Sequence, residues 1–515
     1  MMRTESRHKR NSWAAVIAGF ATAAMMGTVL AGSAIPAQAG PAPLPLELTQ
    51  KVTTDGVFRQ LQAFQRIAQT NNGNRAAGTS GYERSLEYVV NKLTQAGFRV
   101  STPEFTYRKS TVERTKISQG KTNYDGRAFD YSASTPVDGI TAPLRVASRV
   151  GCQASDYPAT TRGAIVLIQR GQCTFAQKQQ LATQPGASAA LIYNSAPGSF
   201  NGNLGEDASG IPIAALSGDT GQALLKRQGS RITVDIQVRI EQTKEKNVIA
   251  QTRSGHTDNV VMAGTHLDGV PAGSGINDNA SGSAALLETA LQLGSNPQIE
   301  NSVRFAWWGA EELGLIGSRA CVEKMPFEQQ LDIAMYLNFD MIGSPNAGYF
   351  VNGYNTSPSS TEPVGSREMA NAFASYIQNE KGIVPDKQPL GGGTDHVYFA
   401  RAGIPSAGLF TGIAPLTEEQ AARWNGVAGQ PADPNYHSAG DTLNNINRRA
   451  IDVNSDAMAW VIASYALDTS SVNGVPPREQ RAAQRAAAPE LLRSPGAGIA
   501  EELPVFDEVR GAVLR

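Results

Sequence analysis

The chain has 515 residues, of which 41% are hydrophobic and 18% are charged. This composition is that of a globular protein with a sizeable core, and the length predicts about two to four domains. The formal net charge of −1 does not favour nucleic acid or an anionic membrane as a partner, and we expect neither.

The N-terminus has the three parts of a secretory signal peptide. A basic stretch with Arg3 and Lys9 precedes an Ala-rich apolar run over residues 13–30, and residues 37–39 (Ala-Gln-Ala) match a cleavage site. We therefore expect residues 1–39 to be removed and the mature chain to be secreted into the extracellular medium. No Cys lies near the cleavage site and no later segment is apolar for long enough to span a bilayer, so we expect no stable membrane anchor after cleavage.

The chain contains three cysteines. Cys152 and Cys173 lie in one region, and in an exported protein such a pair is a candidate disulfide. Cys321 lies far from both in a predicted helix. No His is near it in the sequence, so we expect a buried thiol without a reactive role.

The first part of the main domain is assigned to residues 40–124. Residues 40–50 are rich in proline, and we expect them to be extended. Apolar spacing over residues 55–68 predicts an amphipathic helix, and a capping box at residues 80–83 begins a second one. Residues 98–107 have the composition of a strand.

Residues 125–243 differ in character from the rest of the chain. Short β-rich runs are separated by Gly, Asn and Ser turns, and no His occurs among them. We interpret this segment as a smaller β-rich domain inserted into the first. Its clearest predicted strands are residues 164–169, 189–193 and 232–240.

Strands alternate with helices over residues 244–470, which we assign to the catalytic part of the main domain. The alternation predicts an α/β fold in which helices cover a β-sheet. The tail, residues 471–515, is rich in Ala, Pro and Arg, and we expect it to be disordered or removable. The predicted strands are residues 248–251, 259–264, 303–308 and 333–339, and the predicted helices are residues 282–293, 313–323, 366–379 and 451–467.

Side chains that can bind metal ions follow three of these predicted strands and also occupy two loops. The carboxyl ends of strands in an open α/β sheet form one edge where ligands bind, so we expect these side chains to meet. Imidazole and carboxylate ligands suit Zn²⁺ and, less selectively, Mn²⁺ or Co²⁺. The residues are His266, Asp268, Asp278, Glu311, Glu312, Asp340 and His437.

Two metal ions at a short separation need one ligand that reaches both, and Asp278 is the best candidate because it lies between the other sets. Each residue also has an ordinary explanation. A single His is more often a surface or hydrogen-bonded residue, and Glu311 and Glu312 are also expected at the start of a helix. The occurrence of all of them in order, after successive strands, is what favours a metal site.

The same residues lie in longer motifs at Gly264–Asp268, Gly275–Gly282, Trp308–Gly314 and Asn338–Met341, with further matches at Thr394–His396 and Tyr436–Thr442. These motifs resemble the co-catalytic dizinc aminopeptidase family, which includes glutamate carboxypeptidases and glutaminyl cyclases. The resemblance spans about residues 50–110 and 245–470. It implies a mixed, mainly parallel β-sheet sandwiched by helices, the zinc-exopeptidase type.

The inserted segment resembles a protease-associated domain. The similarity is carried by residues 163–171, Cys173–Phe175 and residues 189–194. In such domains the two cysteines pair, which implies a disulfide between Cys152 and Cys173.

The family resemblance implies two Zn²⁺ ions per chain. One ion is bound by His266 and Asp340, the other by Glu312 and His437, and Asp278 bridges the two.

The resemblance also implies catalytic roles. Glu311 is the general base that moves a proton from water to the leaving amine. Asp268 orients the His266 ring from behind, and Tyr436 donates a hydrogen bond to the developing oxyanion. The residues implied to line the substrate pocket are Asp395 and His396.

The leading hypothesis is a secreted metallo-aminopeptidase that removes apolar residues from peptides with a free N-terminus. A carboxypeptidase for acidic C-termini would need an arginine cluster, and only Arg401 and Arg423 occur in residues 385–440. A glutaminyl cyclase works with one zinc, whereas both His ligands and the bridging Asp are kept here. A non-catalytic receptor or scaffold would lack ligands or the base, and here all five ligands and Glu311 are present.

Overall fold

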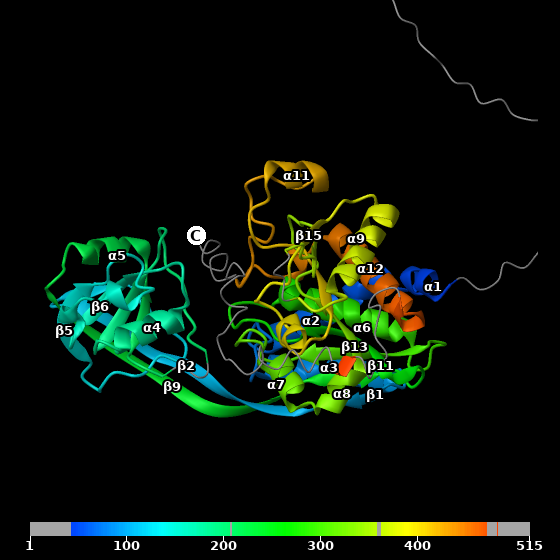
Figure 1. Cartoon of the computed structure of the whole chain (residues 1–515), viewed down its shortest axis with the longest axis horizontal. Coiled ribbons are helices and arrows are strands. Elements are labelled where there is room, and N and C mark those ends of the chain that lie inside the picture. Colours follow the sequence, from blue (N-terminus) through cyan, green and yellow to red (C-terminus); the bar gives the residue numbers. More distant parts are fainter. Residues whose placement is uncertain (1–42, 206–208, 358–361, 471–480, 483–515) are drawn as a thin grey trace, which may run out of the picture. The chain divides into compact units, whose positions relative to one another are not determined.

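A computed structural model of the chain describes residues 43–205, 209–357, 362–470 and 481–482 (Figure 1). The expected signal peptide and most of the expected tail lie outside the described residues. No helix in the described ranges is long and apolar enough to cross a membrane.

Eight strands of the main domain form one mixed sheet in the order β1-β10-β12-β11-β13-β16-β14-β15. The four central strands β12, β11, β13 and β16 are parallel to one another. At one side β10 is antiparallel to β12 and to β1, and at the other β14 is antiparallel to β16 and parallel to β15. The predicted mixed, mainly parallel sheet is therefore confirmed. The strands are β1 (Arg99–Ser101), β10 (Val248–Gln251), β11 (His256–His266), β12 (Asn301–Trp308), β13 (Ile333–Phe339), β14 (Phe350–Asn352), β15 (Asp386–Gln388) and β16 (Ser406–Phe410).

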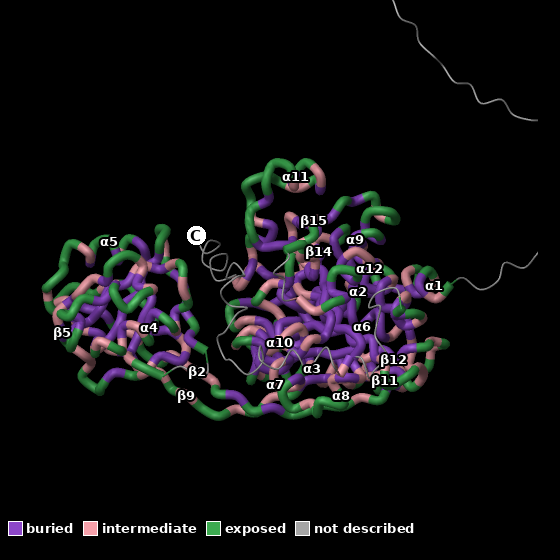
Figure 2. Tube along the Cα trace, in the orientation of Figure 1, coloured by how far each residue is buried: buried purple, intermediate pink, exposed green. Residues whose placement is uncertain are grey.

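Helices cover both faces of this sheet because the central strands are apolar on both sides. Val261 and Ala263 of β11 face one helical layer, and their neighbours Val260 and Met262 face the other. Figure 2 shows that buried residues concentrate in these strands and in the helices against them. The first layer contains α1 (Leu44–Lys51), α2 (Thr54–Thr70), α3 (Ser80–Gln95), α6 (Ser281–Leu293), α9 (Ser366–Lys381) and α12 (Arg448–Leu467), and the second contains α7 (Ile316–Lys324), α8 (Phe327–Asp332) and α10 (His396–Arg401). A further helix, α11 (Glu418–Trp424), packs on β14 through its Trp424 ring.

One expectation for the N-terminal part was wrong. Residues 40–50 were expected to be extended, yet α1 is helical from Leu44 to Lys51. Pro45 lies in the first turn of the helix. Backbone N–H groups there have no acceptor within the helix, so the N–H that proline lacks costs no hydrogen bond. Leu48 is buried against the core, so packing stabilises a helix that proline content alone argued against.

The predicted strand over residues 98–107 is divided between two sheets. Its first part is β1, and its second part begins β2 (Glu104–Gln119), which pairs antiparallel with β9 (Arg231–Lys246) along nearly its whole length. The two long strands run side by side as a ribbon (Figure 1). β9 continues past the expected domain limit at residue 243.

The second sheet has the order β3-β2-β9-β5-β6-β7-β8-β4. Its strands β5 to β8 are parallel, with helices between β6 and β7 and after β8. From the sequence we expected a β-rich domain here and did not predict these helices. The elements are β3 (Thr122–Tyr124), β4 (Arg127–Ala128), β5 (Ile140–Val146), η1 (Ala154–Asp156), η2 (Ala159–Thr161), β6 (Ile165–Gln169), α4 (Phe175–Thr183), β7 (Ala189–Tyr193), β8 (Ile213–Leu216) and α5 (Gly218–Leu225).

The expected disulfide between Cys152 and Cys173 is present. Cys321 is the free cysteine, lies on α7 and is half-buried rather than fully buried. Burial raises the pKa of its thiol to about 11, which agrees with the expectation of an unreactive group.

Candidate metal centre

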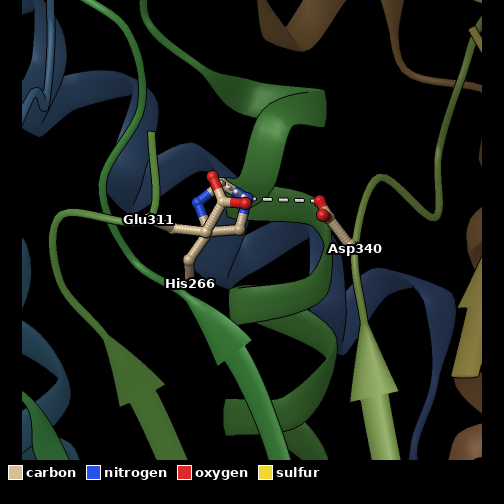
Figure 3. Close-up of side chains that lie close together, drawn as sticks. All are labelled: His266, Glu311 and Asp340. Atoms are coloured by element: carbon tan, nitrogen blue, oxygen red, sulfur yellow. Dashed lines mark hydrogen bonds and ion pairs between the residues drawn. The ribbon is translucent and has the colours of Figure 1, made fainter. Parts of the chain in front are cut away.

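Three neighbouring parallel strands deliver polar side chains to one edge of the main sheet. His266 is the last residue of β11, Asp340 follows the end of β13, and Glu311 lies in the turn after β12. Figure 3 shows these three side chains converging from their separate strands. Parallel strands end at the same edge, which is why residues far apart in the sequence meet here.

The first group of contacts is centred on His266. Its Nε2 atom lies 3.2 Å from Asp340 Oδ1 and 3.2 Å from Asp278 Oδ1, and 3.9 Å from Glu311 Oε2. The Nδ1–H group donates to the backbone carbonyl of Asp268 at 3.1 Å. That bond fixes the tautomer in which Nε2 is free to bind a metal ion.

The second group is centred on His437, which lies in the loop before α12. Its Nε2 atom lies 2.9 Å from Glu312 Oε2 and 3.1 Å from Asp278 Oδ2. Asp278 thus offers one carboxylate oxygen to each histidine. The structure brings together all five residues for which the resemblance implied metal binding.

Asp278 is held in a short irregular helix, η3 (Ile276–Ala280), between β11 and α6. The turn begins at Gly275, whose φ of 61° is left-handed and where an added Cβ would lie 2.6 Å from the Asp278 carbonyl oxygen. The peptide bond from Asp278 to Asn279 is cis. The Asn279 side chain donates to Thr265 Oγ1 and to the Phe339 carbonyl, each at 2.9 Å, which ties the turn to the ends of β11 and β13.

The Asp268 carboxylate mainly supports the glutamate turn. Its two oxygens accept the backbone N–H groups of Glu311 at 3.1 Å and of Glu312 at 3.3 Å. The same carboxylate lies 3.8 Å from His266 Nδ1, farther than the backbone carbonyl of Asp268 itself. The residue therefore supports the His266 ring through its main chain and the turn through its side chain.

Arg75 is a residue of this region that the sequence patterns did not reveal. Its side chain is fully buried, at 0% exposure, in the loop between α2 and α3. The guanidinium donates to the carbonyl oxygens of Leu267 at 2.5 Å, Gly275 at 2.5 Å and Ser274 at 3.1 Å. Burial lowers the pKa of Arg75 to about 10, so it remains a cation beneath the acidic cluster.

The electrostatics of the cluster fit bound cations. Burial raises the pKa of Glu311. Burial alone would lower the pKa values of His266 and His437, but the surrounding carboxylates outweigh it and raise both. The pKa of His437 is raised to about 9. Among the described residues, Glu312 Oε1 is buried without a hydrogen-bond partner. Buried acidic groups of this density need compensating positive charge. Ligand atoms lie within 4.8 Å of one another in two sets, His266 with Glu311 and Asp340, and His266 with Asp278 and Glu312. The donor set is the one that Zn²⁺ prefers.

A cavity opens over the acidic cluster. Its wall includes four carboxylates of the cluster and three apolar side chains, and Tyr436 borders it with its ring stacked on His437 at 3.8 Å between centroids. The carboxylates are Asp278, Glu311, Glu312 and Asp340, and the apolar residues are Met341, Phe410 and Ile413.

The two residues expected in the substrate pocket differ in position. His396 borders the cavity and its Nε2–H donates to the Gly391 carbonyl at 2.6 Å, while burial lowers its pKa to about 4 and keeps it neutral. Asp395 is 1% exposed and is absent from the cavity lining. Burial raises the pKa of Asp395 to about 7.

Comparison with known proteins identifies the class. Residues 247–462 match the sequence profile of Peptidase family M28, and residues 140–224 match that of the PA domain. A relative from Mycobacterium tuberculosis is 43% identical over 455 residues, covering 86% of this chain and 91% of that protein. The chain therefore belongs to peptidase family M28 and carries an inserted PA domain, which confirms the family resemblance.

The M. tuberculosis relative is named a probable lipoprotein aminopeptidase, LpqL. Leucine aminopeptidase 2 of Trichophyton tonsurans is 37% identical over 460 residues, covering 88% of this chain and 91% of that protein. Among solved structures, a zinc aminopeptidase from Bacillus subtilis matches with a TM-score of 0.65 and 26% identity, over 82% of this chain and 98% of that chain.

Proposed function

We propose that this protein is a secreted zinc aminopeptidase that releases apolar residues from the free N-terminus of peptides. The observation that carries the proposal is the placement of Asp278. Its Oδ1 lies 3.2 Å from His266 Nε2 and its Oδ2 lies 3.1 Å from His437 Nε2, as a carboxylate shared by two ions requires. The names of the relatives support the same activity.

Two zinc ions would each be held by one histidine, one further carboxylate and an oxygen of the shared Asp278. The partners are Asp340 with His266 and Glu312 with His437. When bound, zinc supplies Lewis-acid polarisation of the scissile carbonyl and lowers the pKa of a water to about 7.

The chain's own residues move the proton and hold the substrate. Glu311 takes a proton from the attacking water and delivers it to the amine of the departing peptide, which balances the hydrolysis of one amide bond. Burial raises the pKa of the Glu311 carboxyl group, which makes its carboxylate a stronger base. Tyr436, on the cavity wall, donates its hydroxyl proton as a hydrogen bond to the tetrahedral oxyanion.

The cavity chemistry favours an N-terminal residue with an apolar side chain. The cluster carboxylates attract the free α-ammonium group, and Met341, Phe410 and Ile413 give an apolar surface beside them. Among the described residues, neither Lys nor Arg lines this cavity. A carboxypeptidase for acidic C-termini would need such a cation to bind the terminal carboxylate, so the lining argues against that alternative.

Hydrolysis of leucyl-p-nitroanilide by the purified chain tests the proposal. We expect activity that a chelator abolishes and added zinc restores, and no activity on N-acetyl-leucyl-p-nitroanilide, which lacks the free amine. Metal analysis should give two zinc ions per chain. Failure to hydrolyse any aminoacyl-nitroanilide in the zinc-loaded state would overturn the proposal, and cleavage of the acetylated substrate would overturn its exopeptidase part.

The secreted location has its own test. N-terminal sequencing of the protein recovered from culture medium should begin at Gly40, after the A-x-A motif. Retention of residues 1–39 in a cell-bound form would contradict secretion with cleavage.

A further inference from the structure

A buried carboxylate in the His437 loop binds the backbone of the shared aspartate. Asp441 is 3% exposed, and its Oδ1 accepts the N–H of Asn277 at 2.6 Å while its Oδ2 accepts the N–H of Asp278 at 3.0 Å. Both oxygens are therefore directed at two successive main-chain amides. Hydrogen bonds to a charged acceptor are among the strong ones in proteins.

These bonds join two segments that are far apart in the sequence. Asp441 follows His437 in a loop that closes on itself, because the Asp441 N–H donates to the Ser438 carbonyl at 3.2 Å. Asp278 has non-helical backbone angles, φ −109° and ψ 93°, so no regular helix fixes its position. The Asp441 carboxylate therefore connects the Asp278 main chain to the loop that carries His437.

We propose that Asp441 is a positioning residue for the site formed by His437, Glu312 and Asp278, here called the His437 site. By holding the Asp278 main chain against the His437 loop, it keeps Asp278 Oδ2 within reach of the same ion as His437 Nε2. The inference rests on the proposed function, since it assumes that these residues bind zinc. Loss of the Asp441 bonds should weaken zinc binding at the His437 site more than at the site formed by His266, Asp340 and Asp278.

The structure supplies a matched control at Asp433. This carboxylate is also buried, at 0% exposure, and accepts the Asn277 side-chain Nδ2–H at 2.6 Å. Its other oxygen accepts the N–H of Asn435 at 2.8 Å. Asp433 and Asp441 thus both bind Asn277, but among the described residues Asp433 makes no hydrogen bond to Asp278. When Asp433 is changed, the Asn277 side chain keeps two other hydrogen bonds. Its Nδ2–H donates to Ser344 Oγ, and its Oδ1 accepts the N–H of Gly343.

The experiment compares Asp441→Asn with Asp433→Asn in the full chain. Asparagine keeps the shape of aspartate but has one acceptor oxygen, so at position 441 its amide group would face a main-chain N–H. Zinc affinity is measured by competition with a chromophoric chelator. We expect one of the two zinc ions to bind about 10–100-fold more weakly in Asp441→Asn, the range found for residues that support ligands. Asp433→Asn should stay close to wild type.

The outcomes separate the inference from the proposed function. Wild-type affinity for both ions in folded Asp441→Asn would overturn the inference, and so would an equal loss in Asp433→Asn, which would indicate general loosening of the network. Circular dichroism of the metal-free chains checks folding. If Asp441→Asn does not fold, Asp441→Ser offers a single acceptor oxygen on a shorter side chain, and wild-type zinc binding in that variant would also overturn the inference. A wild-type chain that binds no zinc would instead refute the proposed function.

Discussion

The side chain of Asp268 binds the main chain of Glu311, because its carboxylate accepts the Glu311 N–H at 3.1 Å. The position of the proposed base therefore depends on a residue at the end of a different strand. The same carboxylate accepts the Glu312 N–H at 3.3 Å, so one side chain places both the base and a proposed zinc ligand.

The first prediction concerns Asp268→Asn. The variant keeps one acceptor oxygen and turns an amide group toward the other backbone N–H, so the glutamate turn should shift. We expect kcat to fall by about 10–100-fold while the zinc content at saturating zinc stays at the wild-type value. Steady-state kinetics with metal analysis on the same sample checks both. A variant with wild-type kcat would show that Asp268 does not hold the turn.

The second prediction concerns Glu311→Gln. Glutamine has nearly the same size but cannot take a proton from water, so kcat should fall by at least about 10²–10⁴-fold, the usual contribution of a positioned base. Because Glu311 is not assigned as a zinc ligand, zinc binding should be retained. Single-turnover kinetics on the zinc-loaded variant measures the chemical step. Near wild-type turnover would mean that another group is the base.

The third prediction concerns Arg75→Lys. A lysine has one compact ammonium group and cannot satisfy the three carbonyl oxygens that the buried guanidinium reaches. We expect a loss of about 2–5 kcal/mol in the free energy of unfolding, because one or two hydrogen bonds from a charged donor to buried carbonyl groups are lost. Urea unfolding of the metal-free chain provides the measurement.

Arg84→Lys is the control for this change of side chain. Arg84 lies on the same N-terminal part of the chain and forms an exposed pair with Glu87 at 2.7 Å. Its substitution should change the free energy of unfolding by less than about 0.5 kcal/mol. Equal effects of the two substitutions would contradict a special role for Arg75.

The fourth prediction is a pH dependence in the inserted domain. Lys178 is buried, donates to the Val150 carbonyl, and lies 3.4 Å from Cys152 Sγ. Burial lowers its pKa to about 8, whereas the unfolded value is about 10.4. Between these values the unfolded chain binds more protons than the folded chain, so this contribution to stability increases as the pH rises.

Lys178→Met removes this titration. The unfolding free energy of the wild type relative to the variant should therefore increase by about 2–3 kcal/mol between about pH 7.5 and pH 10.5. Urea unfolding at several pH values measures the difference. Parallel pH curves for the two proteins would contradict the prediction.

The sequence was sufficient to predict the long elements of the main domain. The helix expected over residues 451–467 and the strand expected over residues 333–339 match α12 and β13 because their apolar patterns are long and uninterrupted. The strands β14 and β15 have three residues each, too few for any periodicity to appear. The helix α1 was missed because packing of Leu48 outweighs a composition that favours an extended chain.

The candidate site was predictable in its residue types but not in its supports. His266, Glu311 and Asp340 follow strong strand patterns, so the topology of an α/β sheet is enough to bring them together. Arg75 lies in an ordinary-looking loop and meets Leu267, 192 positions away. The hydrogen bond from the Asp278 N–H to the Asp441 carboxylate likewise joins residues 163 positions apart, and no local pattern encodes such a contact.

The pairing of β2 with β9 has a consequence for removal of the inserted domain. Glu104 lies opposite Lys246 and Arg108 opposite Gln242, so the chain leaves the main domain and returns to it at adjacent positions. A deletion between Arg108 and Gln242 can therefore be closed by a two-residue hairpin turn without moving either end. We therefore expect a single in-frame deletion to remove the inserted domain and to leave the strands that present His266 and Asp340 in place.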